Sequence, residues 1–372
     1  MSEIPAETEL DRTSLPESAW WIALRQIPQV GPVRIRMLLD HFGAISTAWA
    51  AAAPELREVL PASLVEEMHA LRDKTDIAEL YSRTTQNGVR VTCLVDDDYP
   101  ALLKEVPSPP PVLYYRGQLV ETDHAAVAIV GTRKVTAYGR EMAHRIASDL
   151  AKAGVTIISG LALGVDGVAH RAALDAGGRT IAVLGSGIDV IYPGAHRDLA
   201  RKIEAQGAVV TDYPPGTQPD RFNFPPRNRI ISGLSRGVVV IEAPERSGAL
   251  ITVDFAAEQG RDAFAVPGPV HAPASAGCLR ILREGATLVR SADDVLEDLH
   301  IRKLHREETS PPPVALSDDE RRLLAVLSSQ PLHLDDIAEA LSKSVGEVSG
   351  ELMMLELQGH VHSAGGGYYS RR

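Results

Sequence analysis

The chain has 372 residues, of which 44% are hydrophobic, and a formal net charge of −11. This length is sufficient for two or three domains, and the hydrophobic fraction is ordinary for a globular protein. The charge excludes a small cationic nucleic-acid binder, so any DNA site has to be a local patch on an acidic body.

The two cysteines, Cys93 and Cys278, lie far apart in the sequence and form no metal-binding pattern. We therefore expect a reduced, cytoplasmic protein without a metal site. The N-terminal segment is acidic and has no apolar core of signal-peptide length. No run approaches the roughly 18 apolar residues of a membrane span, so we expect no membrane partner.

The chain begins with a predicted flexible tail, residues 1–16, and a predicted helical domain, residues 17–85. Apolar residues from Ile35 to Phe42 recur at helical spacing. The segment IPQVGP resembles the turn of helix-hairpin-helix (SAM-like) modules, which presents backbone amides to a DNA phosphate. Gln29 stands where that motif usually has its first glycine, so a helical packing module that does not grip DNA is an equal alternative.

Residues 86–300 alternate between short apolar strands and amphipathic helices. This alternation is typical of a parallel sheet that helices cover on both faces. The sequence therefore predicts an α/β fold with a central Rossmann-like, doubly wound, mostly parallel sheet, whose ligands bind at the carboxyl ends of the strands. The acidic run Asp96–Asp98 is interpreted as a turn and helix cap, because no second cluster of cation ligands lies near it.

The C-terminal part consists of a charged and Pro-rich linker, residues 301–316, and a small unit, residues 317–372. The order of helices and strands predicted for the small unit is that of a winged helix, whose third helix usually enters the major groove of DNA. Here the polar face of that helix carries Glu347, Glu351 and Glu356. We therefore expect a protein-contact or autoregulatory domain, with transcriptional regulation as a weaker alternative.

The usual nucleotide and hydrolase signatures are missing from the sequence. It contains no GxxxxGK[ST], which argues against a P-loop ATPase, and no complete GxGxxG. The segment GSGIDV has Val190 at the third glycine position, so NAD binding is weakly supported. No GxSxG nucleophile elbow is present. We expect no cofactor.

The turn in VGTRKVTAYGRE, residues 130–141, follows an apolar strand and precedes a helix. Gly131 allows the backbone to turn tightly, and Arg133 lies in the mouth of the turn, where its guanidinium could bind a phosphate. An ion pair within the loop is the alternative for Arg133.

A second turn, SGLALGVDGVAH, has the same strand–turn–helix pattern. Gly160 and Gly164 allow close approach of an anion to backbone amides, and Ser159 supplies a hydroxyl. Asp166 is interpreted as a helix cap and loop organiser. His170 is a candidate acid or base, although a buried or capping histidine is the commoner case.

The segment PDRFNFPPRNRIISGLSR, residues 219–236, is the strongest local signal, because it concentrates arginines and aromatic rings in an acidic chain. Its candidate DNA-binding residues are Arg221, Phe224, Arg227, Asn228 and Arg229. Arginines for the backbone and rings for base stacking are what a single-stranded nucleic acid requires. The alternative is that Phe224 is core and that the arginines pair with acids such as Glu242, and we give this more weight for Arg229 than for Arg227.

The segment IEAPERSGALIT, from residue 241 to 252, ends a strand and opens a helix. Glu242 ends the strand, and Ser247 and Thr252 lie at the start of the helix. We assign these three residues, together with Asp166, a supporting role. The start of this helix either binds an anion with its backbone amides or packs against the arginine cluster and orients it.

Six segments together resemble the DNA-processing protein A family (DprA, also called Smf). They are GTRKVTAYG, SGLALGVDGVAH, AVLGSGIDVIYP, FPPRNRIISGLS, EAPERSGALITVDFAAEQGRDAFAVPG and SAGCLRILREGA. They occur in the order of the family over about residues 88–290, and the flanking helical and winged-helix units fit its three-domain form.

The resemblance implies a protein that is not an enzyme and that binds incoming single-stranded DNA during natural transformation. It implies protection of that DNA, loading of the RecA recombinase onto it, and a homodimer formed through the Rossmann-like domain. By motif position, Arg133, the Ser159–Gly160 loop, Phe224, Arg227 and Asn228 would line the DNA groove. Arg221 falls near a position that tends to be basic in the family.

A nucleotide-processing Rossmann-like enzyme of the phosphoribohydrolase type remains the alternative. Its candidate acids are Asp166, Glu242 and Glu258. The PGGxGTxxE signature of those enzymes is missing, because the sequence reads APERSGALITVDFAAEQG at that point.

Overall fold

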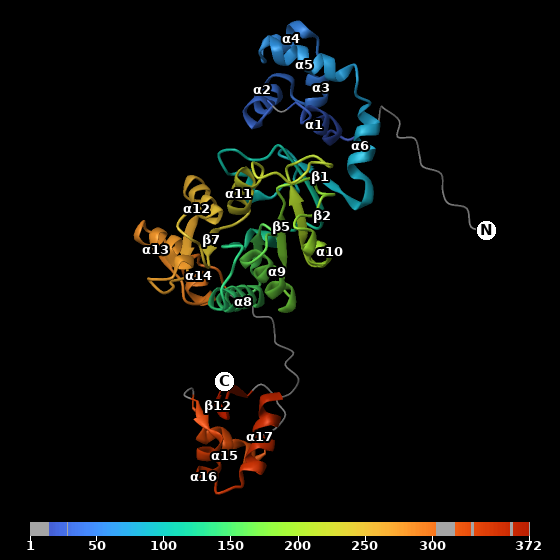
Figure 1. Cartoon of the computed structure of the whole chain (residues 1–372). Helices are drawn as coiled ribbons and strands as arrows, with labels where there is room; N and C mark the ends of the chain where they lie inside the picture. The colour runs from blue at the N-terminus through green and yellow to red at the C-terminus, as the bar shows by residue number, and fades with distance from the viewer. Residues whose placement is uncertain (1–14, 28, 303–316, 329–330, 358–359, 372) are drawn as a thin grey trace, which may run out of the picture. The chain divides into compact units, whose positions relative to one another are not determined.

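A computed structural model describes residues 15–27, 29–302, 317–328, 331–357 and 360–371. The chain forms two compact units, Met1–Arg306 and Glu307–Arg372 (Figure 1). Most of the predicted tail and of the predicted linker lies outside the described residues. No helix within the described ranges is both long enough and apolar enough to cross a membrane.

The first unit begins with short helices, as predicted. They are α1 (Ser18–Leu24), α2 (Pro32–Phe42), α3 (Ile45–Ala50), α4 (Ala53–Arg57), α5 (Ala62–Arg72) and α6 (Ile77–Thr85). Buried residues of these helices, such as Trp21 and Leu38, belong to one continuous core with residues of the sheet. The boundary between residues 85 and 86 therefore stays a prediction.

The turn before α2 satisfies its own polar groups. The N–H of Gly31 donates to the carbonyl of Gln29 at 3.1 Å, and the guanidinium of Arg34 donates to the same carbonyl. These contacts fit the packing interpretation of this module better than the DNA-gripping one.

The sheet of the first unit has nine strands. They are β1 (Arg90–Cys93), β2 (Val112–Gly117), β3 (Ala126–Val130), β4 (Thr156–Ser159), β5 (Thr180–Val183), β6 (Ala208–Thr211), β7 (Gly237–Val240), β8 (Asp262–Ala265) and β9 (Thr287–Leu288). Their order is β1-β2-β6-β5-β4-β3-β7-β8-β9. The strands from β3 to β9 are parallel to one another, and β1 and β2 form an antiparallel edge in which β2 pairs with β6. The predicted doubly wound, mostly parallel sheet is confirmed.

Helices cover both faces of this sheet. They are α7 (Ala101–Lys104), α8 (Ala137–Lys152), α9 (Val165–Asp175), α10 (Arg197–Gln206), α11 (Phe224–Gly233), α12 (Gly248–Glu258), α13 (Ala276–Arg283) and α14 (Ala292–Asp298). Side chains alternate along a strand, so β3 places Val127 and Ile129 in one core and Ala128 and Val130 in the other. The first core includes α8, α9 and α14, and the second includes α11, α12 and the N-terminal helices.

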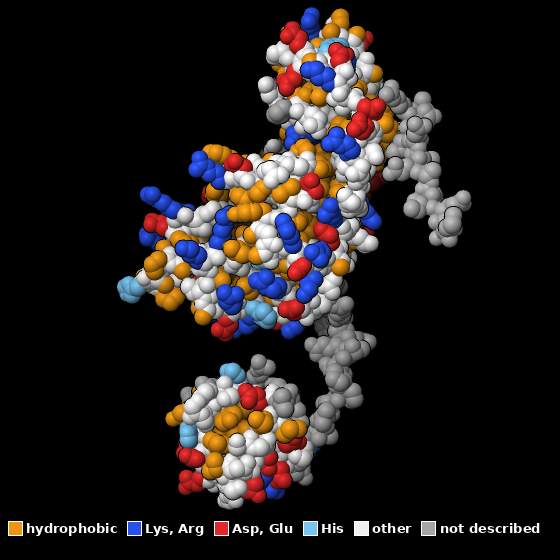
Figure 2. Space-filling model, turned by 45° about the vertical axis from the view of Figure 1, so that its right-hand side comes forward, with side chains coloured by type: hydrophobic (Ala, Val, Ile, Leu, Met, Phe, Trp, Pro, Cys, Tyr) orange, Lys and Arg blue, Asp and Glu red, His pale blue; other side chains and the backbone are white. Residues whose placement is uncertain are grey.

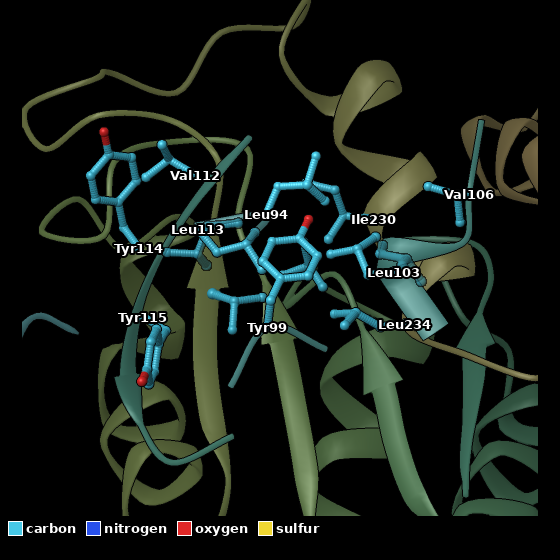
Figure 3. Close-up of a cluster of buried hydrophobic side chains, with 14 of the residues drawn as sticks. Leu94, Tyr99, Leu103, Val106, Val112, Leu113, Tyr114, Tyr115, Ile230 and Leu234 are labelled. Carbon is cyan, nitrogen blue, oxygen red and sulfur yellow. The ribbon is translucent and has the colours of Figure 1, made fainter. Parts of the chain in front are cut away.

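The second core continues from α11 to the segment before β2. Figure 3 shows Leu103 beside Ile230 and Leu234, with Tyr99 close by. These side chains are almost completely buried. The contact fixes α11, which carries the arginine-rich segment, against the rest of the first unit.

The acidic run after β1 forms a turn, as predicted. Asp96 accepts a hydrogen bond from the N–H of Cys93 at 2.7 Å, and Asp98 accepts one from the hydroxyl of Thr92 at 2.6 Å. The predicted helix cap is wrong, because Pro100 is the N-cap residue of α7. Within the described ranges, no group of three or more His, Cys, Asp and Glu side chains could hold a metal ion.

The second unit contains the predicted winged helix. Its elements are α15 (Asp318–Val326), β10 (Leu332–His333), α16 (Leu334–Leu341), α17 (Val345–Leu357), β11 (Val361–Gly365) and β12 (Tyr368–Arg371). The three strands form a small antiparallel sheet, and the buried faces of the three helices make a separate core.

Candidate nucleic-acid interface

A pocket of about 320 Å³ opens at the carboxyl ends of β3 and β7. In the sheet, β4 lies on one side of β3 and β7 lies on the other. The strands β4, β5 and β6 extend in one direction from β3, and β7, β8 and β9 extend in the opposite direction, so the strand order reverses between β3 and β7. Open α/β sheets bind ligands at such a switch point. Its lining includes Gly131, Thr132, Arg133, Asp166, Phe224, Arg227, Asn228, Arg246, Ser247, Gly248 and Thr252.

Two exposed arginines lie at the mouth of this pocket. Arg133 follows the tight turn after β3, and Arg246 lies in the loop before α12. Gly131 is required in this turn, because a Cβ atom there would lie 2.7 Å from the Val165 side chain. The N–H of Thr132 donates to the carbonyl of Glu242 at 2.7 Å and ties the two loops together. We call Arg133, Phe224 and Arg246 the rim of the site.

Phe224 is half-buried and opens α11. The guanidinium carbon of Arg133 lies 5.4 Å from the centroid of its ring, and that of Arg227 lies 6.0 Å away. The exposed ring of Tyr192 lies 5.8 Å away, centroid to centroid. A Cβ atom at Gly185 would lie 2.8 Å from the Phe224 ring, so a glycine is needed there. The ring is therefore held in place and flanked by cations.

Arg227 lies beneath the rim and is only 5% exposed. Its Nη1 donates to the carbonyl of Gly160 at 2.9 Å and also to the carbonyl of Val183. Burial lowers the pKa of Arg227 to about 10, and the nearby Asp166 opposes this shift. Arg227 therefore stays charged at neutral pH, but it braces β5 and the turn after β4 instead of presenting its guanidinium to solvent.

The turn after β4 lies at the same edge of the sheet as the turn after β3, and its Ala162 and Asp166 line the pocket. Asp166 accepts hydrogen bonds from the amides of Gly160 and Ala162, as a loop organiser does. Burial raises the pKa of Asp166. Ser159 is fully buried and donates to the carbonyl of Ile129. We call Ser159, Gly160, Asp166 and Arg227 the floor of the site.

The glycines of this turn serve protein packing. A Cβ atom at Gly160 would lie 2.7 Å from the Arg227 guanidinium, and one at Gly164 would lie 2.3 Å from the Thr132 carbonyl. Gly164 also has a φ of 79°, which disfavours other residues. The amide of Gly160 already donates to Asp166, and the approach of an anion to these two residues stays a prediction.

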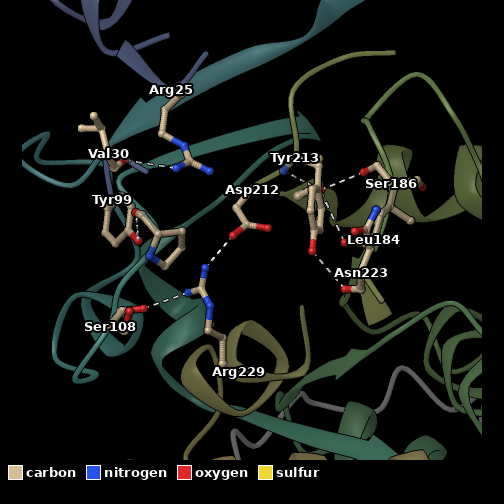
Figure 4. A network of polar contacts seen from close by, with 12 residues as sticks. Arg25, Val30, Tyr99, Ser108, Leu184, Ser186, Asp212, Tyr213, Asn223 and Arg229 are labelled. Carbon is tan, nitrogen blue, oxygen red and sulfur yellow. Dashed lines mark hydrogen bonds and ion pairs between the residues drawn. The ribbon is translucent and has the colours of Figure 1, made fainter. Parts of the chain in front are cut away.

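Arg229 does not line the pocket, and Figure 4 shows its guanidinium directed toward Asp212 and Ser108. Its Nη2 lies 2.5 Å from the Asp212 carboxylate, and its Nη1 donates to the carbonyl of Ser108 at 2.9 Å. Arg229 therefore braces α11 from inside. Its predicted DNA contact is not supported, and its acidic partner is Asp212 instead of Glu242.

A third arginine of the segment, Arg221, does not line the pocket. Arg221 is exposed, and its guanidinium carbon lies 4.7 Å from the centroid of Phe222, which is 69% exposed. These two side chains form a separate exposed pair in the loop before α11.

Glu242 follows β7 closely in the chain, as predicted, and its carboxylate holds the start of α8. Its buried carboxylate accepts hydrogen bonds from the N–H and the hydroxyl of Thr136, at the start of α8. Ser247 is the N-cap of α12 and accepts a hydrogen bond from the N–H of Ala249. Asn228 donates to the carbonyl of Gly248 at 3.1 Å and so holds α11 against α12.

His170 and the cysteines are structural. The Thr180 hydroxyl donates to the carbonyl of Ile157, so it accepts from Nδ1 of His170, 2.7 Å away. Burial lowers the pKa of His170 to about 3, which keeps the ring neutral. Burial raises the pKa of the Cys278 thiol to about 11 and that of the Cys93 thiol as well.

The sequence analysis missed two residues of this region, Arg246 and Tyr192. Arg246 directly precedes Ser247, the N-cap of α12. An arginine next to a helix N-terminus is a sequence signal for an anion site. Tyr192 lies far from Phe224 in the sequence, and only the fold brings the two rings together.

The third helix of the winged helix contrasts with this pocket. Its Met353 and Met354 are exposed, and Glu351 pairs with Lys343 at 2.6 Å. Glu347 accepts hydrogen bonds from Ser344 and caps α17. Figure 2 shows hydrophobic and acidic side chains on the face of this unit that is turned toward the viewer. The described face of α17 thus lacks the arginines that line the pocket of the first unit.

A Rossmann-like sheet with cations and an aromatic ring at its switch point defines a class of protein that can hold phosphates and stack a base. A family model described as DNA recombination-mediator protein A matches residues 90–300, and a model of the DprA winged helix domain matches residues 307–367. Protein Smf of Synechocystis is 36% identical over 394 residues, with 96% of this chain and 99% of that protein covered. The chain belongs to the DNA recombination-mediator protein A family.

Solved structures agree with this assignment. The X-ray structure of DNA processing protein A from Streptococcus pneumoniae has a TM-score of 0.67 and 36% identity, and it covers 77% of this chain and 99% of that one. DNA processing protein A from Helicobacter pylori, reported for its single-stranded DNA binding mode, has a TM-score of 0.52 and 27% identity. That match covers 58% of this chain and 98% of the other.

Proposed function

We propose that this protein binds single-stranded DNA at the switch-point pocket. The observation that carries the proposal is the position of Phe224, whose ring lies at the pocket between the guanidinium groups of Arg133 and Arg227. An unstacked base can lie on such a ring, with a phosphate near Arg133 or Arg246. The single-stranded DNA binding mode of the Helicobacter pylori protein supports this assignment.

The arrangement favours single strands over duplex. Stacking on Phe224 needs a base whose face is free, and the bases of a duplex are already stacked on one another. The pocket volume of about 320 Å³ is too small for a duplex to enter. The remaining contacts are to the backbone, so we expect little preference among sequences.

The net charge of −11 repels DNA at long range. The local cations of the rim therefore have to supply the attraction, and binding should weaken steeply with salt because each phosphate contact releases counterions.

The family assignment extends this proposal to a cellular role. We infer that the protein acts in the cytoplasm during natural transformation, where it protects incoming single-stranded DNA and helps to load the RecA recombinase onto it. We also infer a homodimer that forms through the Rossmann-like domain. These roles rest on the family resemblance and on the relatives named DNA processing protein DprA.

We propose that the protein acts by binding instead of catalysis. Asp166 and Glu242, two of the acids that an enzyme of this fold could use, are buried and already accept hydrogen bonds from the protein. Glu258 is exposed on α12 and does not line the pocket. An enzyme of the phosphoribohydrolase type remains testable, because it would release free base from nucleoside monophosphates.

The test is a fluorescence anisotropy titration of labelled oligo-dT, with duplex of the same length beside it, across a salt series. We expect single-strand-selective binding whose logarithm falls linearly with the logarithm of salt concentration, with a slope of about −0.7 per phosphate contact. Equal binding to duplex, or no binding, would overturn the proposal. Release of free base from a panel of nucleoside monophosphates would instead assign the protein as an enzyme of the phosphoribohydrolase type.

A further inference from the structure

The start of α12 has unused hydrogen-bonding capacity that faces the pocket. This helix runs over Gly248–Glu258, and Ser247 caps it by accepting from the amide of Ala249. The amide of Leu250 donates to the carbonyl of Ser247. Within the part of the chain that the structure describes, the N–H of Gly248 has no acceptor. Because Gly248 is exposed and lines the pocket, a ligand in the pocket can approach this amide.

A second, independent feature lies one turn into the same helix. Thr252 lines the pocket, its side chain is fully buried, and its hydroxyl has no hydrogen-bond partner. A buried hydroxyl without a partner is destabilising, so an acceptor that reaches the pocket wall would relieve it. The hydrogen of a hydroxyl group rotates about the C–O bond, so it can be directed toward such an acceptor.

Arg246 supplies the charge for this feature. It is exposed, lines the pocket and directly precedes the cap residue. Among the described residues it forms no ion pair or hydrogen bond. A helix N-terminus favours a negative group by itself, and a guanidinium beside it matches the oxygens of a phosphate.

We propose that Arg246, the amide of Gly248 and the hydroxyl of Thr252 form a phosphate subsite that is distinct from the Arg133–Phe224 contact. Its ligand is a phosphate group, either a phosphodiester of a DNA strand or the phosphate of a free nucleotide. The first source rests on the function proposed above, and the second does not. For a strand, the subsite holds the phosphate next to the base stacked on Phe224.

The test uses the full chain with three single variants, Arg246→Gln, Thr252→Val and the control Arg201→Gln. Arg201 is 75% exposed on α10, does not line the pocket and loses the same charge. Labelled oligo-dT is titrated across a salt series. Thymidine 5′-monophosphate and thymidine are titrated separately by calorimetry, so that the phosphate is the only difference between the two small probes.

Arg246→Gln should weaken oligo-dT binding about tenfold and make the salt slope shallower by about 0.7. Thr252→Val should weaken binding severalfold, while its melting temperature stays equal or rises because the unpaired hydroxyl is gone. A structural role for Thr252 would instead lower stability without changing affinity. Arg201→Gln should match the parent protein.

Parent-like affinity and salt slope in both Arg246→Gln and Thr252→Val would overturn the subsite and leave the proposed function standing. If the parent protein does not bind oligo-dT, the proposed function fails and the small probes decide the subsite. Binding of thymidine 5′-monophosphate but not thymidine, lost in Arg246→Gln, then supports a nucleotide subsite. Binding of neither probe overturns the subsite as well.

Discussion

The rim and the floor of the pocket both contain arginine, but the two layers differ in what the arginine does. Arg133 and Arg246 on the rim are exposed, and neither forms an ion pair among the described residues. Arg227 on the floor is buried and donates to two backbone carbonyls. The same type of side chain is therefore open to a ligand in one layer and braces the protein in the other.

This difference shows that a cluster of arginines in a sequence has no single meaning. Arg227 and Arg229 lie on the same short helix as Phe224, yet Arg227 points into the floor and Arg229 points to Asp212. Guanidinium groups that form no ion pair with the protein can bind phosphate without breaking one. We therefore expect substitutions on the rim to change DNA binding and not stability. The predictions below separate the two layers.

The largest effect is expected from Arg227→Met. This change leaves the carbonyls of Gly160 and Val183 without their donor and Asp166 without a nearby cation. Removing one partner of a buried charged group costs about 3–5 kcal/mol, so the midpoint of urea unfolding should fall markedly. Arg133→Gln is the control and should unfold like the parent. A fully stable Arg227→Met variant would show that the floor is not a structural brace.

Phe224→Leu should have the next largest effect, and on binding alone. The change keeps an apolar side chain at the start of α11 but removes the ring that a base can stack on. Stacking contributes about 1–3 kcal/mol per base, so oligo-dT affinity should fall roughly 5- to 150-fold at constant salt. Tyr192→Leu serves as the comparison for a more peripheral ring. Unchanged affinity in Phe224→Leu would show that no base stacks on Phe224.

Arg133→Gln should weaken oligo-dT binding about tenfold, equally for all sequences, because it removes a backbone contact. The salt slope should become shallower by about 0.7. Arg133 also lies over Phe224, so the double variant with Phe224→Leu should lose less than the sum of the two losses. Strict additivity in this double-mutant cycle would mean that the two side chains act on separate parts of the strand.

The last effect concerns pH and comes from His170, which is buried on α9. Burial lowers its pKa to about 3 in the folded protein, whereas an unfolded histidine titrates near 6.5. Between these values only the unfolded state binds the proton, so stability falls as the pH drops below about 6.5, by at most about 1.4 kcal/mol per pH unit. His170→Asn, which can also donate to Thr180, should flatten this dependence in urea unfolding between pH 6.5 and 5. An equally steep dependence in the variant would assign it to other groups.

The sheet could be predicted from the sequence because its signal is local. Apolar runs such as Ala126–Val130 alternate with helices that have a buried face, for example α8 with Met142, Ile146 and Leu150, and this pattern defines a doubly wound sheet without any long-range information. The same local pattern predicts that the Gly131 turn lies at the carboxyl ends of the strands, where Gly131 and Phe224 line the pocket.

The orientation of each polar side chain could not be predicted in the same way. Whether Arg227 faces the solvent depends on carbonyls from β5 and from the turn after β4, which are far from it in the sequence. The pairing of Arg229 with Asp212 and the contact of Tyr192 with Phe224 are also long-range. A motif identifies the residues of a site, and only the packing of neighbouring strands decides which of them are free.

The central claim is that a single strand of DNA lies on the rim of the switch-point pocket. Photo-crosslinking tests it most directly, with oligo-dT that carries 5-iodouracil, the full chain and mass spectrometry of the crosslinked peptides. The account predicts crosslinks to the peptides that contain Phe224 or Tyr192, and their loss in Phe224→Leu. Crosslinks confined to α17, or to the helices before β1, would contradict it.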